Sequence, residues 1–247
     1  MFQYNRKSFE TQLDEDHTVS ILKTYLQEVV YGGNDGIIST FVVVSGFTGA
    51  MGSEGFSSGL SLATLMLFGF ANLIADAVSM AMGNFLSIRA DKDVYRDLAS
   101  LEMKRLHAEK GKELAETEYI LTEKGFTTAQ ARKMAEIMSQ NRPYWLSFMM
   151  GSELGLDNIL DENPVITALV TFISFICFGF IPLFPFVFFG SSDNTFLISA
   201  ISTGFALVVL GILRAFITRQ SPFKKIFETL FVGALASGVA YFVGTLF

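Results

Sequence analysis

Apolar residues in this sequence gather into long uncharged stretches instead of alternating with polar ones. Each stretch has about 18 residues or more, enough for a helix that rises about 1.5 Å per residue to cross a bilayer core of roughly 30 Å. The stretches run from Gly36 to Ser53, Gly55 to Ala75, Pro164 to Ser192, Asn194 to Leu213 and Thr229 to Phe247. The pattern predicts an all-α, polytopic membrane protein with five transmembrane helices.

Two of the predicted spans have features of their own. The second begins near Ser61 and stays largely apolar to Ile88, so it is longer than the hydrocarbon is thick and its end should project into the cytoplasm. The third contains the segment IPLFPF, in which Pro182 and Pro185 remove backbone donors. We expect these prolines to kink the third helix near the outer face of the membrane.

Composition and charge agree with this pattern. Of the 247 residues, 51% are hydrophobic and 17% are charged, and the mean hydropathy is +0.43. This balance argues against a soluble enzyme. The net charge of −6 belongs to the segments outside the lipid, and the single cysteine excludes an intrachain disulfide.

The positive charges predict an orientation. All 18 Lys and Arg residues fall on one side of the membrane if the five stretches are spans. They lie before the first span, between the second and third, and between the fourth and fifth. The positive-inside rule then places the N-terminus in the cytoplasm and the C-terminus outside or in a lumen.

Four segments follow from these observations. Before the first span, Asp16 or Thr18 can cap an amphipathic helix that leads into the membrane interface. The segments are a cytoplasmic N-terminus with this helix (1–30), spans one and two (31–88), a cytoplasmic Glu- and Met-rich domain (89–162) and spans three to five (163–247).

The cytoplasmic domain is rich in helix-forming residues. One helix should continue from the second span towards Leu106, with a break at Gly111. The expected helices after that run from Glu113 to Thr122, from a cap at Thr127 or Thr128 to about Gln140 where Pro143 follows, and from Tyr144 to about Leu156.

A polar stripe runs along the second span. Asn72, Asp76, Met80 and Asn84 follow one another at steps of four residues and share one face of the helix. A carboxylate and a thioether beside two amides can hold a transition-metal ion. The alternative is a polar seam that joins helices. We favour an ion path, because a seam seldom needs an acid.

A second acid, Asp35, lies in YGGNDGIISTF at the cytoplasmic entrance of the first span. A carboxylate there is costly unless it is hydrated, paired or bound to a cation. It therefore joins the predicted transport path. In the alternative, the neighbouring glycines loosen the helix and leave Asp35 in interfacial water.

Carboxylates and methionines also gather in the cytoplasmic domain. Glu102, Glu109, Glu113 and Glu116 are spaced by seven, four and three residues, and an unbroken helix would hold them within an arc of roughly 60°. Such an arc favours a metal site, although a solvated acidic face would look the same. Met149 and Met150 lie four and three residues before Glu153 and offer sulfur beside another carboxylate.

Several kinds of chemistry are excluded. The histidines His17 and His107 stand in neither an E-x-x-H nor an H-E-x-x-H motif, which excludes a ferritin-type di-iron site and a zincin. The sequence has no G-x-x-x-x-G-K-[ST] phosphate loop, so ATP-driven pumping is not expected. We expect a secondary transporter that uses an ion gradient or downhill flow, not an enzyme.

Five segments together carry a resemblance to a known family. In chain order they are YGGNDGIISTFVVVSG, ANLIADAVSMAMGNFLS, the Glu-rich helices, WLSFMMGSELGL and IPLFPF. This set resembles the vacuolar iron transporter family over nearly the whole chain from about Tyr31. The resemblance implies five spans, a homodimer, a cytoplasmic metal-binding domain, and exchange of cytosolic Fe²⁺ or similar divalent ions for protons. It also implies a place in a bacterial inner membrane or a vacuolar membrane.

The resemblance also implies roles for particular residues. Asp35 and Met80 correspond to the family's path-lining aspartate and methionine. The metal-binding residues correspond to Glu102, Glu113, Glu116, Met149 and Glu153.

The chain departs from the family pattern at two positions. Arg105 stands where the family has another glutamate, a loss for which Glu109 can compensate, and Asn84 stands where a glutamate is common. Asp76 is found in only part of the family, so its predicted role depends on its place in the span.

The functional hypothesis follows. Divalent metal, foremost Fe²⁺, is gathered by the acidic helices, passes the Asp35, Asp76 and Met80 region and leaves the cytoplasm as protons return. A carboxylate desolvated among helices binds either a proton or a metal ion, which couples the two flows. Metal is the substrate and no permanently bound cofactor is expected; the partners are metal ions, protons, membrane lipid and a second copy, without nucleic acid. The alternatives are a membrane-anchored iron sensor or chaperone and a Mn²⁺ or Zn²⁺ exporter.

Overall fold

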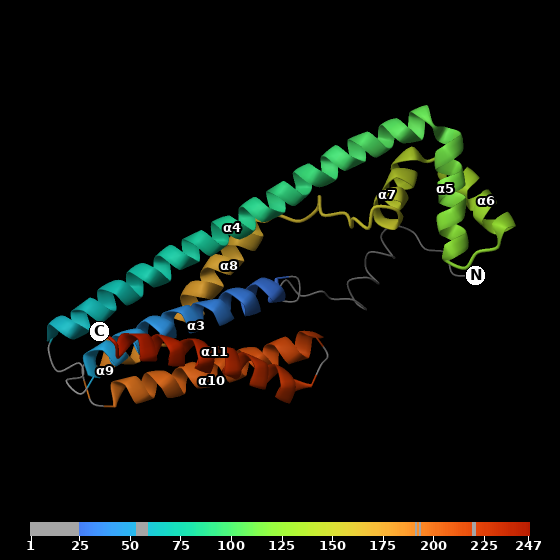
Figure 1. Cartoon of the computed structure of the whole chain (residues 1–247). Coiled ribbons are helices and arrows are strands. Elements are labelled where there is room, and N and C mark those ends of the chain that lie inside the picture. The colour runs from blue at the N-terminus through green and yellow to red at the C-terminus, as the bar shows by residue number, and fades with distance from the viewer. Residues whose placement is uncertain (1–24, 53–58, 191, 193, 219–220) are drawn as a thin grey trace, which may run out of the picture. The chain divides into compact units, whose positions relative to one another are not determined.

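The computed structural model describes residues 25–52, 59–190, 192, 194–218 and 221–247. Throughout these residues the regular elements are helices, as predicted (Figure 1). The chain divides into two compact units. We call Met1–Asn84 with Val165–Phe247 the apolar unit and Phe85–Pro164 the Glu-rich unit. Most of the predicted amphipathic helix before the first span lies outside the described residues.

The apolar unit contains helices suited to a membrane. Within the described residues, three helices are long and apolar enough to cross one, namely Ser61–Ala108, Thr195–Phe216 and Pro222–Gly244, and the helix Pro164–Gly179 is apolar but shorter. These helices confirm the prediction of a helical membrane protein. The number of five spans stays a prediction.

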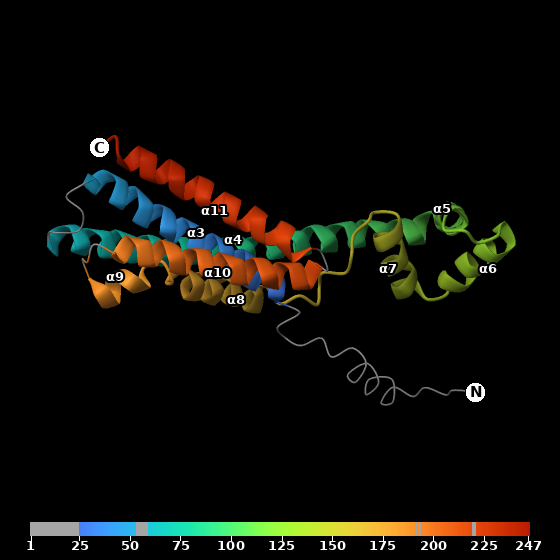
Figure 2. The same cartoon turned by 90° about the horizontal axis from the view of Figure 1, so that it is seen from below.

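Three helices of the apolar unit run side by side in both views: α3 (Leu26–Met51), α10 (Thr195–Thr218) and α11 (Pro222–Gly244) (Figures 1 and 2). Ile37 of α3 is fully buried in a cluster with Leu207 and Leu210 of α10. Glycines allow closer approach elsewhere on α3. A Cβ on Gly36 would lie only 2.5 Å from the Phe175 carbonyl oxygen, so only glycine fits there.

The third predicted span is interrupted where the prolines stand. Helix α8 (Pro164–Gly179) ends before them, and the short α9 (Phe184–Phe189) begins with Pro185 in its first turn. The Ser199 hydroxyl of α10 donates a hydrogen bond of 2.7 Å to the Pro182 carbonyl. The prolines therefore break the helix, which is a larger change than the predicted kink, and a neighbouring helix satisfies a backbone acceptor near the break.

Helix α4 (Gly59–Ala108) is continuous over 50 residues, which confirms that the second span extends far beyond its apolar part. The predicted break at Gly111 is wrong in position. The chain breaks at Glu109, whose φ of −123° and ψ of 38° end the helical geometry, and Gly111 lies inside the next helix, α5 (Lys110–Glu123). These dihedral angles are open to a residue with a side chain, so the break does not need a glycine.

Three shorter helices pack against the end of α4 in the Glu-rich unit (Figure 1). They are α5, α6 (Thr128–Met138) and α7 (Arg142–Ser152). After α5 the chain turns at Gly125, whose φ of 97° favours glycine. The predicted cap at Thr127 is confirmed by its N–H, which donates to the Gln130 side chain at 3.0 Å.

Two predicted helix ends in this unit are corrected. Helix α6 ends at Met138, earlier than Gln140, and Pro143 does not follow it as a stop but lies in the first turn of α7. Helix α7 ends at Ser152 instead of Leu156, and the Leu156 N–H donates back to the Met150 carbonyl at 2.9 Å. A proline fits the first helical turn because its missing N–H has no partner there.

The core of the Glu-rich unit forms around Trp145. Its side chain is 1% exposed and packs with Leu106 of α4, Leu121 of α5 and Ala131 of α6. The segment after α7 is tied to α4 by Lys92, whose ammonium donates to the Leu160 carbonyl at 2.8 Å and also to the Glu162 carbonyl. This core joins α4, α5, α6 and α7. Carboxylates lie where these helices meet.

Candidate metal centre

Three glutamates from three helices meet in the Glu-rich unit. Glu102 lies on α4, Glu113 on the first turn of α5, and Glu153 caps the end of α7. One carboxylate oxygen of each lies within 4.8 Å of the others. We call these three residues the Glu cluster. The break at Glu109 makes the cluster possible, because it lets α5 pack against α4 through Leu106 and Leu121.

The predicted arc on one helix face is not what joins these acids. Glu102 and Glu113 lie on different helices and meet across the turn between α4 and α5. Glu109 lies at that turn, exposed, outside the Glu cluster, and 3.7 Å from the Lys112 ammonium. Glu116 also pairs with Lys112, at 3.6 Å, and contributes its charge to the cluster from one turn further along α5.

Burial gives the Glu cluster its electrostatic character. Glu102 and Glu113 are each 1% exposed, and Glu102 Oε1 and Glu113 Oε2 are buried without a hydrogen-bond partner. Arg105 lies 3.6 Å from the other Glu102 oxygen. Carboxylates in such a place bind a proton or a cation strongly, because either one removes an uncompensated buried charge.

The pKa values follow from that burial. Desolvation, followed by the charges of Glu102, Glu116 and Glu153, raises the pKa of Glu113 to about 7. Glu153 is exposed as a residue, but partial desolvation of its carboxyl and the charges of Glu102 and Glu116 raise its pKa as well, with Arg105 and Lys112 opposing them. At a pH near 7 the Glu113 carboxyl is therefore only partly protonated, so a proton and a metal ion would compete for it.

The predicted methionines lie on α7. Met149 and Met150 are both 0% exposed, and Met149 belongs to the core around Trp145. The Met149 sulfur lies 3.4 Å from the Thr117 hydroxyl, which in turn lies 2.7 Å from the Glu113 carbonyl. The sulfur is therefore held against the same turn of α5 that carries Glu113, while the side chain also fills the core.

Sequence reasoning missed two residues that support this arrangement. The Trp145 indole N–H donates to the Thr117 hydroxyl at 2.8 Å, and both side chains are buried. Thr117 thus links α5 to α7. Nothing in the sequence pointed to either residue, because their contact depends on how the helices pack. Lys112 was also missed, although its position three after Glu109 and four before Glu116 is a local signal for ion pairing.

The four residues of the polar stripe on α4 make different kinds of contact in the apolar unit. The Asn72 amide donates to Asp76 at 2.7 Å, so these two residues share a face as predicted. Met80 packs against the apolar cluster around Phe175. The Asn84 amide donates to the Thr171 hydroxyl of α8 at 3.0 Å, which is the contact expected of a seam between helices.

Asp35 and Asp76 lie near each other. Asp35 is on α3 and Asp76 on α4, and the two carboxylates lie close enough for their charges to interact. Asp35 is exposed on the surface of the chain and Asp76 is half-buried. The structure thus brings together the two acids that the sequence placed in the first and second spans.

These features describe a helical protein with apolar helices suited to a membrane and a cluster of three glutamates, two of them buried, whose oxygens are close enough together to hold a cation. A family model described as the VIT family matches residues 26–245, and the chain belongs to this family. This membership confirms the resemblance seen in the sequence.

Curated relatives agree with the family assignment. The chain is 34% identical to a vacuolar iron transporter of Toxoplasma gondii over 244 residues, which cover 94% of this chain and 77% of the relative. It is 28% identical to vacuolar iron transporter 1 of Arabidopsis thaliana over 216 residues, covering 87% and 83%. For a vacuolar iron transporter of Plasmodium falciparum the identity is 30% over 243 residues, covering 94% and 85%. The relatives are named as transporters, which confirms the prediction of a transporter and not an enzyme.

Proposed function

We propose that this chain moves a divalent transition metal, foremost Fe²⁺, out of the cytosol across a membrane in exchange for protons. The observation that carries the proposal is the Glu cluster, in which Glu102 and Glu113 are buried with unpartnered oxygens. Oxygen ligands attract divalent cations, and a nearby thioether such as Met149 adds preference for transition metals over Mg²⁺ and Ca²⁺. The names of the relatives support iron as the cargo.

Proton exchange is supported by the chemistry of Glu113. Its pKa of about 7 makes proton and metal competitors for one carboxylate near neutral pH. In our proposal the Glu cluster, with Glu116, Met149 and Met150 around it, gathers metal in the cytoplasm. Glu109 serves as an outer acid that attracts cations to the turn between α4 and α5.

The metal then passes acids in the membrane. Asp35 and Asp76 provide the charged groups of the path, and the Asn72 amide orients the Asp76 carboxylate through its hydrogen bond. Met80 and Asn84 line the path only in a conformation that releases them from their packing contacts. The chain has five spans in this proposal, with the N-terminus cytoplasmic and the C-terminus lumenal, and works as a homodimer in a vacuolar membrane.

Reconstitution tests the proposal. The full chain in proteoliposomes should carry Fe²⁺, and flux should rise when protons are supplied from the opposite side. Competition by Mn²⁺ and Zn²⁺ at two lumenal pH values ranks the substrates. A wild-type chain that binds metal but carries none would instead be a membrane-anchored sensor or chaperone.

A single substitution tests the path. Asp76→Asn keeps the size of the side chain but removes its charge, and we expect it to lower flux roughly tenfold or more. The control is Asp157→Asn, the same change at an exposed acid of the Glu-rich unit, which should leave flux unchanged. Full proton-dependent flux in Asp76→Asn would exclude Asp76 as the coupling site.

A further inference from the structure

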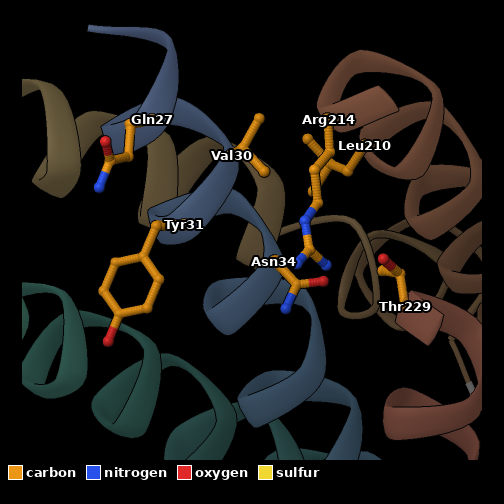
Figure 3. Close-up of a pocket in the computed structure, with 7 residues that line it drawn as sticks. All are labelled: Gln27, Val30, Tyr31, Asn34, Leu210, Arg214 and Thr229. Carbon is orange, nitrogen blue, oxygen red and sulfur yellow. The ribbon is translucent and has the colours of Figure 1, made fainter. Parts of the chain in front are cut away.

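A pocket of about 400 Å³ lies in the apolar unit where α3 begins, α10 ends and α11 begins (Figure 3). Its lining includes Gln27, Tyr31 and Asn34 of α3, Leu210 and Arg214 of α10, and Thr229 of α11. None of these residues belongs to the Glu cluster or to the pair of acids Asp35 and Asp76. The volume suits a small molecule or a lipid headgroup.

The charge of the pocket favours an anion. Arg214 extends its guanidinium into the pocket beside Asn34 (Figure 3), and there is no acid among the described residues that line it. Glu228, outside the lining, lies 3.7 Å from Arg214 but closer, at 3.1 Å, to Lys225. The carboxylate is therefore shared between two cations, and the Arg214 guanidinium has five N–H donors in all, more than one carboxylate can accept from. A guanidinium matches the fork of phosphate oxygens particularly well.

Two other groups in the pocket call for hydrogen-bond donors. Asn34 Oδ1 is buried without a hydrogen-bond partner. The Thr229 hydroxyl donates its proton to the Lys225 carbonyl at 2.9 Å, which leaves the oxygen as an acceptor. A buried acceptor without a donor is costly, so a ligand with hydroxyl groups is favoured beside the anion.

We propose that this pocket binds a phosphate ester that carries hydroxyl groups. The phosphate pairs with Arg214, and the hydroxyls donate to Asn34 Oδ1 and Thr229 Oγ1. Leu210 provides an apolar wall for the carbon skeleton. The pocket lies where α10 ends and α11 begins, and both helices are long enough to cross a membrane, so a phospholipid headgroup can reach it if both helices span the bilayer. The same chemistry is offered by a polyol phosphate in solution. The proposal does not depend on metal transport.

Thermal unfolding of the purified full chain in detergent tests the chemistry. Phosphatidylglycerol, which has headgroup hydroxyls, should raise the Tm more than phosphatidic acid, which has none, and phosphatidylcholine should have no effect. Soluble glycerol 3-phosphate forms a second arm. Stabilisation by the lipid alone identifies a lipid headgroup site, and stabilisation by both identifies a site for the phosphate ester itself. No stabilisation by either, or an equal effect of phosphatidylcholine, overturns the proposal.

Variants locate the site. Arg214→Gln should weaken the apparent affinity for phosphatidylglycerol roughly tenfold or more, because a charge-assisted contact is lost. Lys224→Gln removes an exposed cation from the same end of α11 without touching the pocket lining, and should leave the affinity unchanged. Equal effects of the two substitutions would show attraction by surface charge only. Thr229→Val, which keeps the side-chain shape, should reduce the preference for phosphatidylglycerol over phosphatidic acid; an unchanged preference would exclude the hydroxyl contacts.

Discussion

The acids of the two units are held in opposite ways. In the Glu-rich unit, Glu102 and Glu113 are buried and each has an oxygen without a hydrogen-bond partner. In the apolar unit, Asp76 is half-buried and accepts a hydrogen bond from Asn72, and Asp35 is exposed on the surface of the chain.

In the proposed function, this difference gives the two groups of acids different roles. Glu102 and Glu113 each have a buried oxygen without a hydrogen-bond partner, although Arg105 lies 3.6 Å from Glu102, so in this proposal the Glu cluster gains most from taking up a cation. Asp76 already has a partner, so a metal ion gains less by reaching it. A strong site that collects metal and a weaker one that lets it pass are what a transporter requires. The following substitutions test this contrast.

The largest effect is expected when the Glu cluster is removed. Glu102→Gln with Glu113→Gln deletes two charged ligands and should weaken Mn²⁺ binding to the full chain by roughly two orders of magnitude, measured by calorimetry. Glu123→Gln, an exposed acid near the end of α5, is the matched control. Asp76→Asn should leave this binding almost intact. Equal losses in the Asp76 and cluster variants would erase the contrast between the units.

A smaller effect is expected from pH. The pKa of Glu113 is raised from 4.5 to about 7, so below about pH 7 a metal ion must displace its proton. Affinity should fall with decreasing pH by up to roughly tenfold per unit. Without metal the sign of the stability effect is the reverse: the raised pKa favours the folded state at low pH, and this contribution is lost as pH rises from about 4.5 to about 7.

Glu113→Gln provides the check on both pH effects. The amide does not titrate, so the dependence of Mn²⁺ affinity on pH should flatten, and the stability of the metal-free chain should no longer decline over the same pH range. If the variant keeps the wild-type slopes, Glu113 is not the group at which proton and metal compete.

The smallest effect is expected at Thr117. Thr117→Val removes the hydroxyl that accepts from Trp145 and contacts the Met149 sulfur, and should lower the free energy of unfolding of the Glu-rich unit by about 1–3 kcal/mol. The chain has a single tryptophan, so its fluorescence reports this unit directly. Thr117→Ser keeps the hydroxyl and should recover most of the loss. An unchanged free energy of unfolding in Thr117→Val would mean that these hydrogen bonds do not stabilise the unit.

Much of the fold could be predicted from local patterns. Uncharged stretches located the apolar helices, and Pro182 and Pro185 located the interruption of the third one. The break at Glu109 could not be predicted, because residues of many types can adopt its backbone dihedral angles. Gly111 suggested a break because glycine weakens helices, but it lies inside α5. The number of spans depends on α3 and α8, whose lengths alone do not decide whether they cross a membrane.

The candidate site could be predicted in its residues but not in its geometry. The spacing of the glutamates pointed to one helix face, yet Glu102 and Glu113 meet because the chain turns between them. Glu153 came from the resemblance and from its neighbouring methionines. The partners of Asn84 and Met149 depend on tertiary packing between residues far apart in the chain, which a single sequence does not encode in any local signal.

In the proposed function, Arg105 affects how quickly a metal ion leaves the Glu cluster. It stands where the resemblance to the family implies a glutamate, and its guanidinium lies 3.6 Å from Glu102. Replacing a negative side chain by a positive one raises the charge of the site by two units, and a more positive site attracts a metal cation less strongly. When a metal ion leaves, the Arg105 guanidinium is already close enough to pair with the Glu102 carboxylate. One cation thus replaces another as the metal is released. Arg105 is therefore expected to shorten the time for which a metal ion stays bound at the Glu cluster.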